Sequence, residues 1–354
     1  MRGRETPDRR PLFGVILATV LAAAMFLLSG CSGGESGSTA VEPTQEAAPS
    51  ATIPDPTATL AEPTATATAT ATVEPTATLV PTATPLPSST PEPTPTPEPT
   101  LPSSAFVNGI PVEQIVVLPE EVEENVRQIF AAGRARGRDP YAFSKLGDSL
   151  IATPSFLAMF ETHPYNLGPY DYLQPALDYF AGSFERYGVA LRPGLHAWGV
   201  FDPLWANKDW CQANENLLDC EIRLNNPSVM LVLLGTNDVG YPEGFDFNMR
   251  KVIQTLIDAG IIPVIVTKAD RFEGPDNTNN DILRTIAADF QVPLWDYDLV
   301  AETLPNRGLQ EDGVHLTVFP ENDFNMPEAY QLGHGVHNLT ALMMLDALRQ
   351  IVSG

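Results

Sequence analysis

Three short polar motifs in the second half of the chain carry residue types that suit acyl-transfer chemistry. They are Gly147-Asp148-Ser149, Gly235-Thr236-Asn237-Asp238 and Asp312-x-x-His315. A serine hydroxyl is a weak nucleophile until a neighbouring base takes its proton. A histidine can be that base, and a carboxylate three residues away can fix its tautomer. An asparagine amide can donate to a developing oxyanion. Together these types predict a nucleophile, a base with its orienting acid, and an oxyanion donor.

Each motif taken alone also has a purely structural interpretation. Gly-Asp-Ser and Asp312-Gly313 are common in turns. Asn237-Asp238 could cap a following helix, and Ser149 could do the same. A cap at Ser149 is not required, however, because Thr153 followed by Pro154 predicts a helix start of its own.

The elements predicted around these motifs alternate between strands and helices. Apolar runs bounded by turn residues predict strands at 141–146, 227–235, 261–267 and 292–297. Helical spacing and end signals predict helices at 118–137, 245–260, 277–290 and 338–352. This alternation predicts an α/β fold, a three-layer α/β/α sandwich with a mainly parallel sheet. Two of the motifs follow predicted strands directly, where such sheets collect their chemistry.

The three motifs in this order resemble the SGNH hydrolase family, also called GDSL esterases and lipases. The resemblance rests on Gly-Asp-Ser-Leu at 147–150, Gly-x-Asn-Asp at 235–238 and Asp-x-x-His at 312–315. It covers the chain from about Tyr141 to the C-terminus and implies a flavodoxin-like fold and a serine esterase. The α/β-hydrolase alternative requires Gly-x-Ser-x-Gly around the nucleophile, and Ser149 does not meet this pattern because position 151 is Ile.

The resemblance also implies roles for individual residues. Ser149 would be the nucleophile, His315 the base and Asp312 the residue that orients His315. Asn237 and the backbone N–H of Ser149 would donate to the oxyanion. The family adds the N–H of a glycine, for which Gly199 is preferred here over Gly194, although the surrounding sequence departs from the family pattern.

The N-terminus predicts export. A basic start and the apolar run 12–28 lead into Leu28-Ser29-Gly30-Cys31, so residues 1–30 are typical of a signal peptide. The last four residues resemble a bacterial lipobox, which implies lipidation of Cys31 and a position at the bacterial cell surface, anchored to the membrane. A plain transmembrane anchor is the alternative, since the apolar run is near the lower length for a span. Arg9-Arg10 leaves the twin-arginine route open beside the general one.

Residues 31–104 are rich in Pro, Thr and Ala and contain no aromatic residue. Such a composition cannot bury enough apolar surface to order itself, so we expect a disordered linker, with O-glycosylation left open. The linker would hold a single hydrolase domain, residues 105–354, away from the membrane.

The charge and the cysteines restrict the partners. A net charge of -24 makes nucleic-acid binding and docking on anionic lipid headgroups unfavourable. Cys211 and Cys220 predict a disulfide in an exported protein, with two free thiols as the alternative. No zinc-ligand spacing accompanies them. We expect no metal, no organic cofactor and a monomer.

Two histidines and three tryptophans each allow more than one interpretation. His334 and His337 could suggest a metal site, but exposed imidazoles at a loop-to-helix junction are the favoured interpretation. Trp198, Trp205 and Trp210 could stack on a sugar, wall an acyl pocket or pack a loop.

The sequence therefore predicts an exported, lipid-anchored serine hydrolase that cleaves carboxylic esters. Acetylated glycans and simple or lipid esters are the expected substrates. The alternatives are a cell-surface glycan-binding module with vestigial catalysis, and an acyltransferase acting on envelope glycans.

Overall fold

A computed structural model describes residues 105–354 of the protein. The predicted signal peptide, the lipidation site Cys31 and the predicted linker lie outside the described residues. In residues 105–354 no helix is both long enough and apolar enough to cross a membrane.

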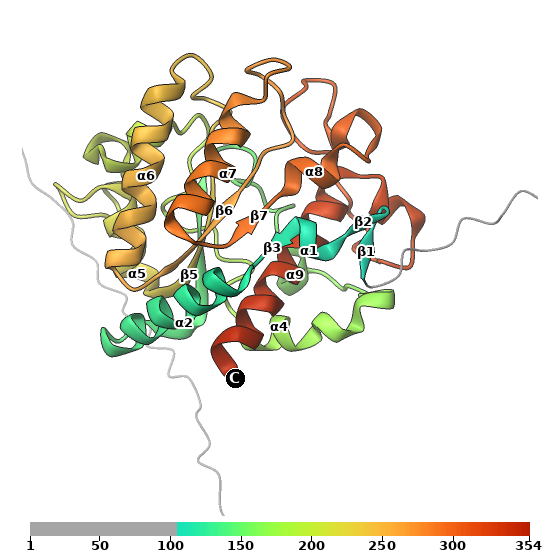
Figure 1. Ribbon diagram of the computed structural model, residues 1–354, viewed down its shortest axis with the longest axis horizontal. Helices are drawn as coiled ribbons and strands as arrows, with labels where there is room; N and C mark the ends of the chain where they lie inside the picture. Colours follow the sequence, from blue (N-terminus) through green and yellow to red (C-terminus); the bar gives the residue numbers. More distant parts are fainter. Residues whose placement is uncertain (1–104) are drawn as a thin grey trace, which may run out of the picture. The chain divides into compact units, whose positions relative to one another are not determined.

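A five-stranded sheet in the order β3-β7-β6-β5-β4 forms the centre of the fold (Figure 1). The strands are β3 (Val116–Val117), β4 (Asp139–Gly147), β5 (Pro227–Leu233), β6 (Ile262–Val266) and β7 (Leu294–Trp295). Strands β4, β5, β6 and β7 are parallel, and β3 pairs antiparallel with β7. Beyond β4, Leu191 forms a parallel bridge with Gly147. Counted in chain order from β4, the parallel positions follow the flavodoxin-like order 2-1-3-4-5.

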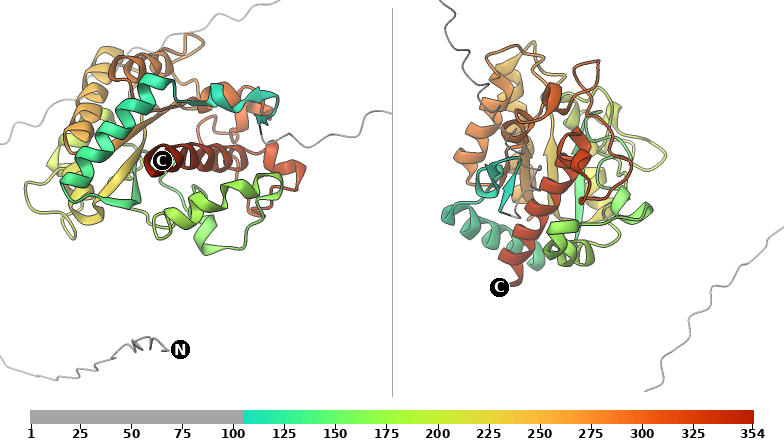
Figure 2. Two further views of the ribbon diagram at one scale, coloured as in Figure 1. Left: turned by 60° about the horizontal axis from the view of Figure 1, so that its bottom comes forward. Right: turned by 90° about the vertical axis from the view of Figure 1, so that its right-hand side faces the viewer.

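Helices cover both faces of this sheet, as the α/β/α prediction requires (Figure 2). One face carries α2 (Glu120–Ala135), α6 (Pro242–Asp258) and α7 (Thr278–Phe290), and the other carries α9 (Gly333–Ser353) with α4 (Gln174–Tyr179) beside it. The remaining helices are α1 (Val112–Ile115), α3 (Met159–Thr162), α5 (Leu217–Asn225) and α8 (Tyr297–Ala301). The 3-10 turns are η1 (Gly168–Leu173), η2 (Ala197–Phe201), η3 (Pro203–Trp205), η4 (Pro305–Gly308) and η5 (Pro327–Tyr330), and β1 (Phe106–Val107) pairs with β2 (Ile110–Pro111).

The burial of the strands explains why their sequences were recognisable. Every residue of β5 and β6 is buried, because helices cover both faces of the sheet. A strand buried on both sides reads as a continuous apolar run rather than an alternating one. Helix α2 has three glutamates in its first turn and Arg134 in its last turn, and charges at these ends interact favourably with the helix dipole.

The predicted helix start at Thr153-Pro154 is wrong. Residues 149–158 form turns, and the first helix after Ser149 is α3, which begins at Met159. The side chain of Asn338 in α9 accepts from the N–H of Leu157 at 3.0 Å and donates to the carbonyl of Ser155 at 2.8 Å. These tertiary bonds satisfy backbone groups that a helix would otherwise pair. Leu157 also has a φ of 63°, which a right-handed helix does not allow.

Candidate active site

Ser149 lies directly after β4, at the point where the strand order of the sheet reverses. Ligands of open α/β sheets bind in the crevice at this point. The chain reaches it through Gly147, where a side-chain Cβ would lie 2.6 Å from the carbonyl oxygen of Leu233 on β5. Ser149 is half-buried, and within the described part of the chain its backbone N–H has no hydrogen-bond partner. That N–H is therefore free to donate to a substrate oxygen.

His315 and Asp312 are presented by a tight turn before α9. Leu309 and Leu316 pair antiparallel at the base of the turn, and the N–H of Gln310 donates to the carbonyl of His315 at 2.8 Å. Gly313 has a φ of 70°, a left-handed conformation that glycine adopts without strain. The turn places both functional side chains on one side, as their spacing of three predicted.

The three predicted triad residues are hydrogen-bonded in series. Nε2 of His315 lies 3.0 Å from Oγ of Ser149, and Nδ1 lies 2.7 Å from Oδ2 of Asp312. The His315 side chain and the N–H groups of Val314 and His315 donate to Asp312 and lower its pKa to about 2. A carboxylate at Nδ1 holds the proton there, which leaves Nε2 as the acceptor for the serine proton.

The amide of Asn237 lies beside the residue that precedes the nucleophile. Its Nδ2 donates to Oδ2 of Asp148 at 3.1 Å and to the carbonyl oxygen of Leu195 at 3.2 Å. An amide nitrogen carries two hydrogens, so donation to an oxyanion requires that one of these bonds be exchanged for the substrate oxygen. Sequence reasoning did not find these two partners, although Asp148 is part of the Gly-Asp-Ser motif.

Asp148 is fully buried and accepts from the N–H of Leu150 at 3.0 Å as well as from Asn237. Burial raises the pKa of Asp148 to about 7, the N–H of Leu150 opposes this rise, and the nearby carboxylates Asp270 and Asp238 add to it. Asp148 therefore couples the nucleophile loop to Asn237 without belonging to the triad.

The two candidates for the oxyanion glycine differ in whether their backbone N–H is already bonded. Gly199 is buried in η2, and its N–H donates to the carbonyl of His196 at 3.0 Å, so this N–H is already used. A Cβ at position 199 would lie 3.1 Å from the Trp205 ring, and the absence of a side chain lets that ring pack. Gly194 is exposed, and no residue among 105–354 pairs with its N–H. Gly194 also precedes Leu195, whose carbonyl oxygen accepts from Asn237 at 3.2 Å, so Gly194 stays a candidate for the oxyanion glycine.

A pocket of about 320 Å³ adjoins Asn237. Trp198 and Tyr241 contribute exposed aromatic rings to it, 50% and 68% exposed respectively. Trp205 packs edge-on against Trp198 behind the pocket, with ring centroids 5.9 Å apart. The full lining is His196, Trp198, Asn237, Asp238, Gly240, Tyr241, Gly244, Phe245 and Asn248. A larger hollow of about 420 Å³ between α2 and α9 contains none of the predicted site residues.

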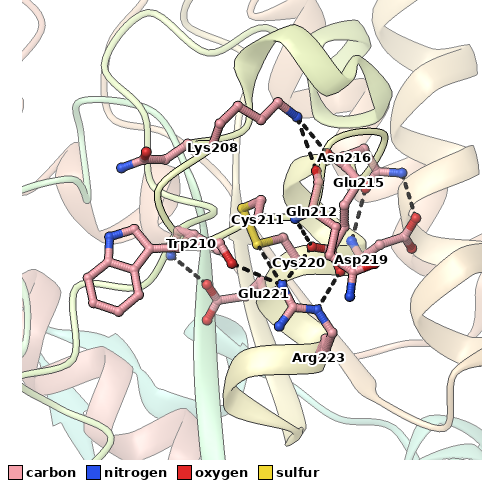
Figure 3. Close-up of a disulfide and its surroundings, with 12 residues drawn as sticks. Lys208, Trp210, Cys211, Gln212, Glu215, Asn216, Asp219, Cys220, Glu221 and Arg223 are labelled. Carbon is pink, nitrogen blue, oxygen red and sulfur yellow. Dashed lines mark hydrogen bonds and ion pairs between the residues drawn. A yellow bond between two sulfur atoms is a disulfide. The ribbon is translucent and has the colours of Figure 1, made fainter.

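The predicted disulfide between Cys211 and Cys220 is present (Figure 3). It ties the loop that carries Trp210 to the start of α5. Arg223 reinforces this link, because its guanidinium donates to Glu215 at 2.7 Å and to the carbonyl of Trp210 at 3.0 Å (Figure 3). Among the described residues, only Cys211, Glu215 and Cys220 bring three potential metal-ligand atoms close together. The two cysteine sulfurs are bonded to each other in the disulfide.

The expectation for His334 and His337 is wrong, because both imidazoles are buried in the first turns of α9. The His337 ring lies 4.4 to 4.8 Å from the rings of Tyr297, Trp295 and Phe156. Burial lowers the pKa of His334 to about 4 and that of His337 well below its usual value. Both rings are thus neutral parts of the core that supports the turn of His315.

No protein-family profile matches the sequence, and no curated protein matches it. Among solved structures, the chain is similar to the psychrotrophic esterase EstA from Pseudoalteromonas sp., with 16% identity and a TM-score of 0.37 over 60% of this chain and 99% of EstA. It is also similar to TesA, with 16% identity and a TM-score of 0.39 over 58% of this chain and 99% of TesA. An acetylxylan esterase from Geobacillus stearothermophilus shows 14% identity and a TM-score of 0.37 over 58% of this chain and 93% of its own. At this level of likeness, the activity of the present chain has to be argued from its own residues.

Proposed function

We propose that the protein is a serine esterase of the SGNH type that cleaves carboxylic esters. The single observation that carries the proposal is the series of hydrogen bonds from Ser149 through His315 to Asp312. A surface module that only bound glycans would not need a serine held at 3.0 Å from a base whose other nitrogen faces a carboxylate.

In the first half-reaction, Oγ of Ser149 attacks the ester carbonyl carbon while Nε2 of His315 takes the hydroxyl proton. The carbonyl oxygen becomes an oxyanion, which the N–H of Ser149 and the amide of Asn237 stabilise. When the oxyanion collapses, the bond to the alcohol oxygen breaks and His315 returns the proton to that oxygen.

In the second half-reaction, water attacks the acyl-enzyme and His315 takes its proton. The acid leaves, and Ser149 regains its hydrogen. Transfer to an envelope glycan would follow the same first half-reaction with a sugar hydroxyl in place of water, so acyl transfer remains the alternative activity. The expected substrates are acetylated glycans and simple or lipid esters outside the cell, where a lipid anchor at Cys31 would hold the enzyme.

The proposal is tested with aryl esters of increasing acyl length, using the full chain extracted in detergent. We expect hydrolysis by the wild type and loss of nearly all of it in Ser149→Ala. Ser155→Ala, which removes a half-buried hydroxyl elsewhere in the same loop, is the matched control and should retain activity. Hydrolysis that survives Ser149→Ala at the wild-type rate would refute the assignment of the nucleophile, and no hydrolysis of any ester by the wild type would refute the function.

A further inference from the structure

The loop that carries Asn237 rests on a buried cluster of charged side chains at the carboxyl end of β6. The hydroxyl of Thr236 donates to Oδ2 of Asp270 at 2.8 Å. The other carboxylate oxygen of Asp270 accepts from Nζ of Lys268 at 3.0 Å. Lys268 also donates to Glu273 at 2.5 Å. The residue immediately before Asn237 is therefore tied to an ion-paired cluster.

The cluster holds the loop at a second point as well. The remaining oxygen of Glu273 accepts from the backbone N–H of Asn279 at 3.2 Å. The side-chain amide of Asn279 donates to the carbonyl oxygen of Gly235 at 2.7 Å. Gly235 has a φ of 127°, and a Cβ there would lie 3.0 Å from the Phe245 ring. Both residues that lead into Asn237 are thus fixed, one through its hydroxyl and one through its carbonyl.

The burial of this cluster makes it costly to maintain. The side chains of Lys268 and Asp270 are 0% exposed, and that of Glu273 is 4% exposed. Well-packed apolar residues often give as much stability as a buried ion pair, so stability alone is a weak reason for one. Among residues 105–354, no member of the cluster bonds to Ser149 or His315. The cluster instead contacts the loop of Asn237, directly through Thr236 and indirectly through Asn279.

We infer that the cluster of Lys268, Asp270 and Glu273 positions Asn237 for oxyanion stabilisation by holding Thr236 and Gly235. The inference rests on the proposed function, because it requires an oxyanion to stabilise. An oxyanion donor contributes through preorganisation, so its geometry must be set before the reaction. A rigid support matters more here than elsewhere, since Asn237 must exchange one of its two bonds for the substrate oxygen without moving away. Thr236 is a positioning residue that acts through the backbone of its neighbour.

The test compares two substitutions at position 236 in the full chain. Thr236→Val keeps the branched shape and removes the hydroxyl bond to Asp270, whereas Thr236→Ser keeps the hydroxyl. Small displacements of catalytic groups cost up to about 10²-fold in rate, so Thr236→Val should lower kcat by about ten- to a hundredfold. KM should change much less, because the lost interaction is made in the transition state. Thr236→Ser should retain most of the wild-type kcat, and Asn237→Ala should set the limit with a loss of about 10²–10³.

Thr340→Val is the matched control for simple loss of a buried hydroxyl. Thr340 lies on α9, away from the Asn237 loop, and its hydroxyl accepts from Nε1 of Trp295 at 3.0 Å. We expect it to destabilise the fold without lowering kcat. If Thr236→Val is too unstable to assay, Asp270→Asn removes the charge at the other end of the same bond and should lower kcat in the same direction.

The outcomes separate the two proposals. A wild-type kcat in Thr236→Val, with hydrolysis still abolished by Ser149→Ala, would overturn the inference and leave the esterase proposal intact. An equal loss in Thr236→Ser or in Thr340→Val would also overturn it, because the hydroxyl bond would not be the cause. A wild type without any esterase activity would instead refute the proposed function.

Discussion

At the scale of single residues, the two carboxylate oxygens of Asp312 have different hydrogen-bond partners and different roles. Oδ1 accepts from the backbone N–H groups of Val314 and His315, at 2.9 and 3.0 Å, which fixes the carboxylate. Oδ2 faces Nδ1 of His315 at 2.7 Å and determines which nitrogen carries the proton. The pKa of Asp312 is lowered to about 2. The stabilising contacts of this carboxylate are therefore present above about pH 4 and are lost as the pH falls toward 2.

Because Oδ1 binds backbone N–H groups and Oδ2 faces His315, the effect of Asp312→Asn can be predicted. The amide oxygen should take the place of Oδ1, because two N–H donors point there, and the NH₂ group would then face Nδ1 of His315. Nδ1 would have to accept, so Nε2 would carry the proton and could not take one from Ser149. We expect kcat to fall by about 10⁴, the effect that the wrong tautomer has in serine-protease triads. Steady-state kinetics and circular dichroism measure the loss and check the fold.

Glu311→Gln is the control for this prediction, since Glu311 is a neighbouring exposed acid that loses the same charge. It should leave kcat unchanged. If Glu311→Gln lost as much activity as Asp312→Asn, general electrostatics rather than the tautomer would be responsible. Asp312 also stays ionised throughout the range between pH 4 and 7, so a loss of activity in that range does not come from titration of this carboxylate.

At the scale of elements, the sequence predicted those strands and turns whose conformation depends on residues close together in the chain. The runs at 227–235 and 261–267 became β5 and β6, because a strand buried on both faces needs nothing but apolar residues and turn ends. The turn of Asp312 and His315 was predictable for the same reason, since a spacing of three confines both side chains locally. The resemblance supplied Ser149 as their partner across the fold.

What the sequence did not predict depends on contacts between distant residues. The helix expected at Thr153-Pro154 does not form, because Asn338, far along the chain, bonds to the carbonyl of Ser155 and the N–H of Leu157. The sequence favoured Gly199 over Gly194, but it does not show which of the two N–H groups is already bonded within the fold. The buried cluster behind Thr236 likewise joins residues from two loops that no local pattern connects.

The disulfide acts at this scale, because it fixes one loop to one helix. It closes a loop between positions nine residues apart. In the chain-entropy account, a bridge over such a short loop stabilises the fold by about 2–3 kcal/mol. Cys211→Ala/Cys220→Ala should therefore lower the free energy of unfolding by about that amount, as measured by urea denaturation. Since Arg223 still ties Glu215 to the carbonyl of Trp210, the loop should keep its path and kcat should change little.

The reduced wild type is the control for this prediction. Dithiothreitol should lower its unfolding midpoint toward that of the double variant, whose own midpoint should not respond to the reductant. Equal midpoints for the oxidised wild type and the double variant would show that the bridge adds no stability. A large loss of kcat in the double variant would show that the loop supports the neighbouring pocket of Trp198.

At the scale of the whole molecule, the strongly negative net charge has to be compatible with the proposed attachment to a membrane. The net charge of -24 makes direct docking on an anionic membrane surface unfavourable. Within residues 105–354 there is no helix that could cross a membrane. For attachment we consider two alternatives in the N-terminal part of the chain, the proposed lipid at Cys31 and a retained apolar run at 12–28.

The two alternatives leave different N-termini, and this gives the last prediction. A lipoprotein would begin at a lipidated Cys31, whereas a transmembrane anchor would keep the chain upstream of it. In a bacterial host supplied with an alkyne fatty acid, the wild type should take up the label and Cys31→Ser should not. Ser32→Ala, the matched control, should be labelled like the wild type. Mass spectrometry of the N-terminal peptide then decides, because an unlabelled wild-type chain that retains residues 12–28 would refute the lipid anchor. Cys211 and Cys220 cannot produce the label while they are bonded to each other.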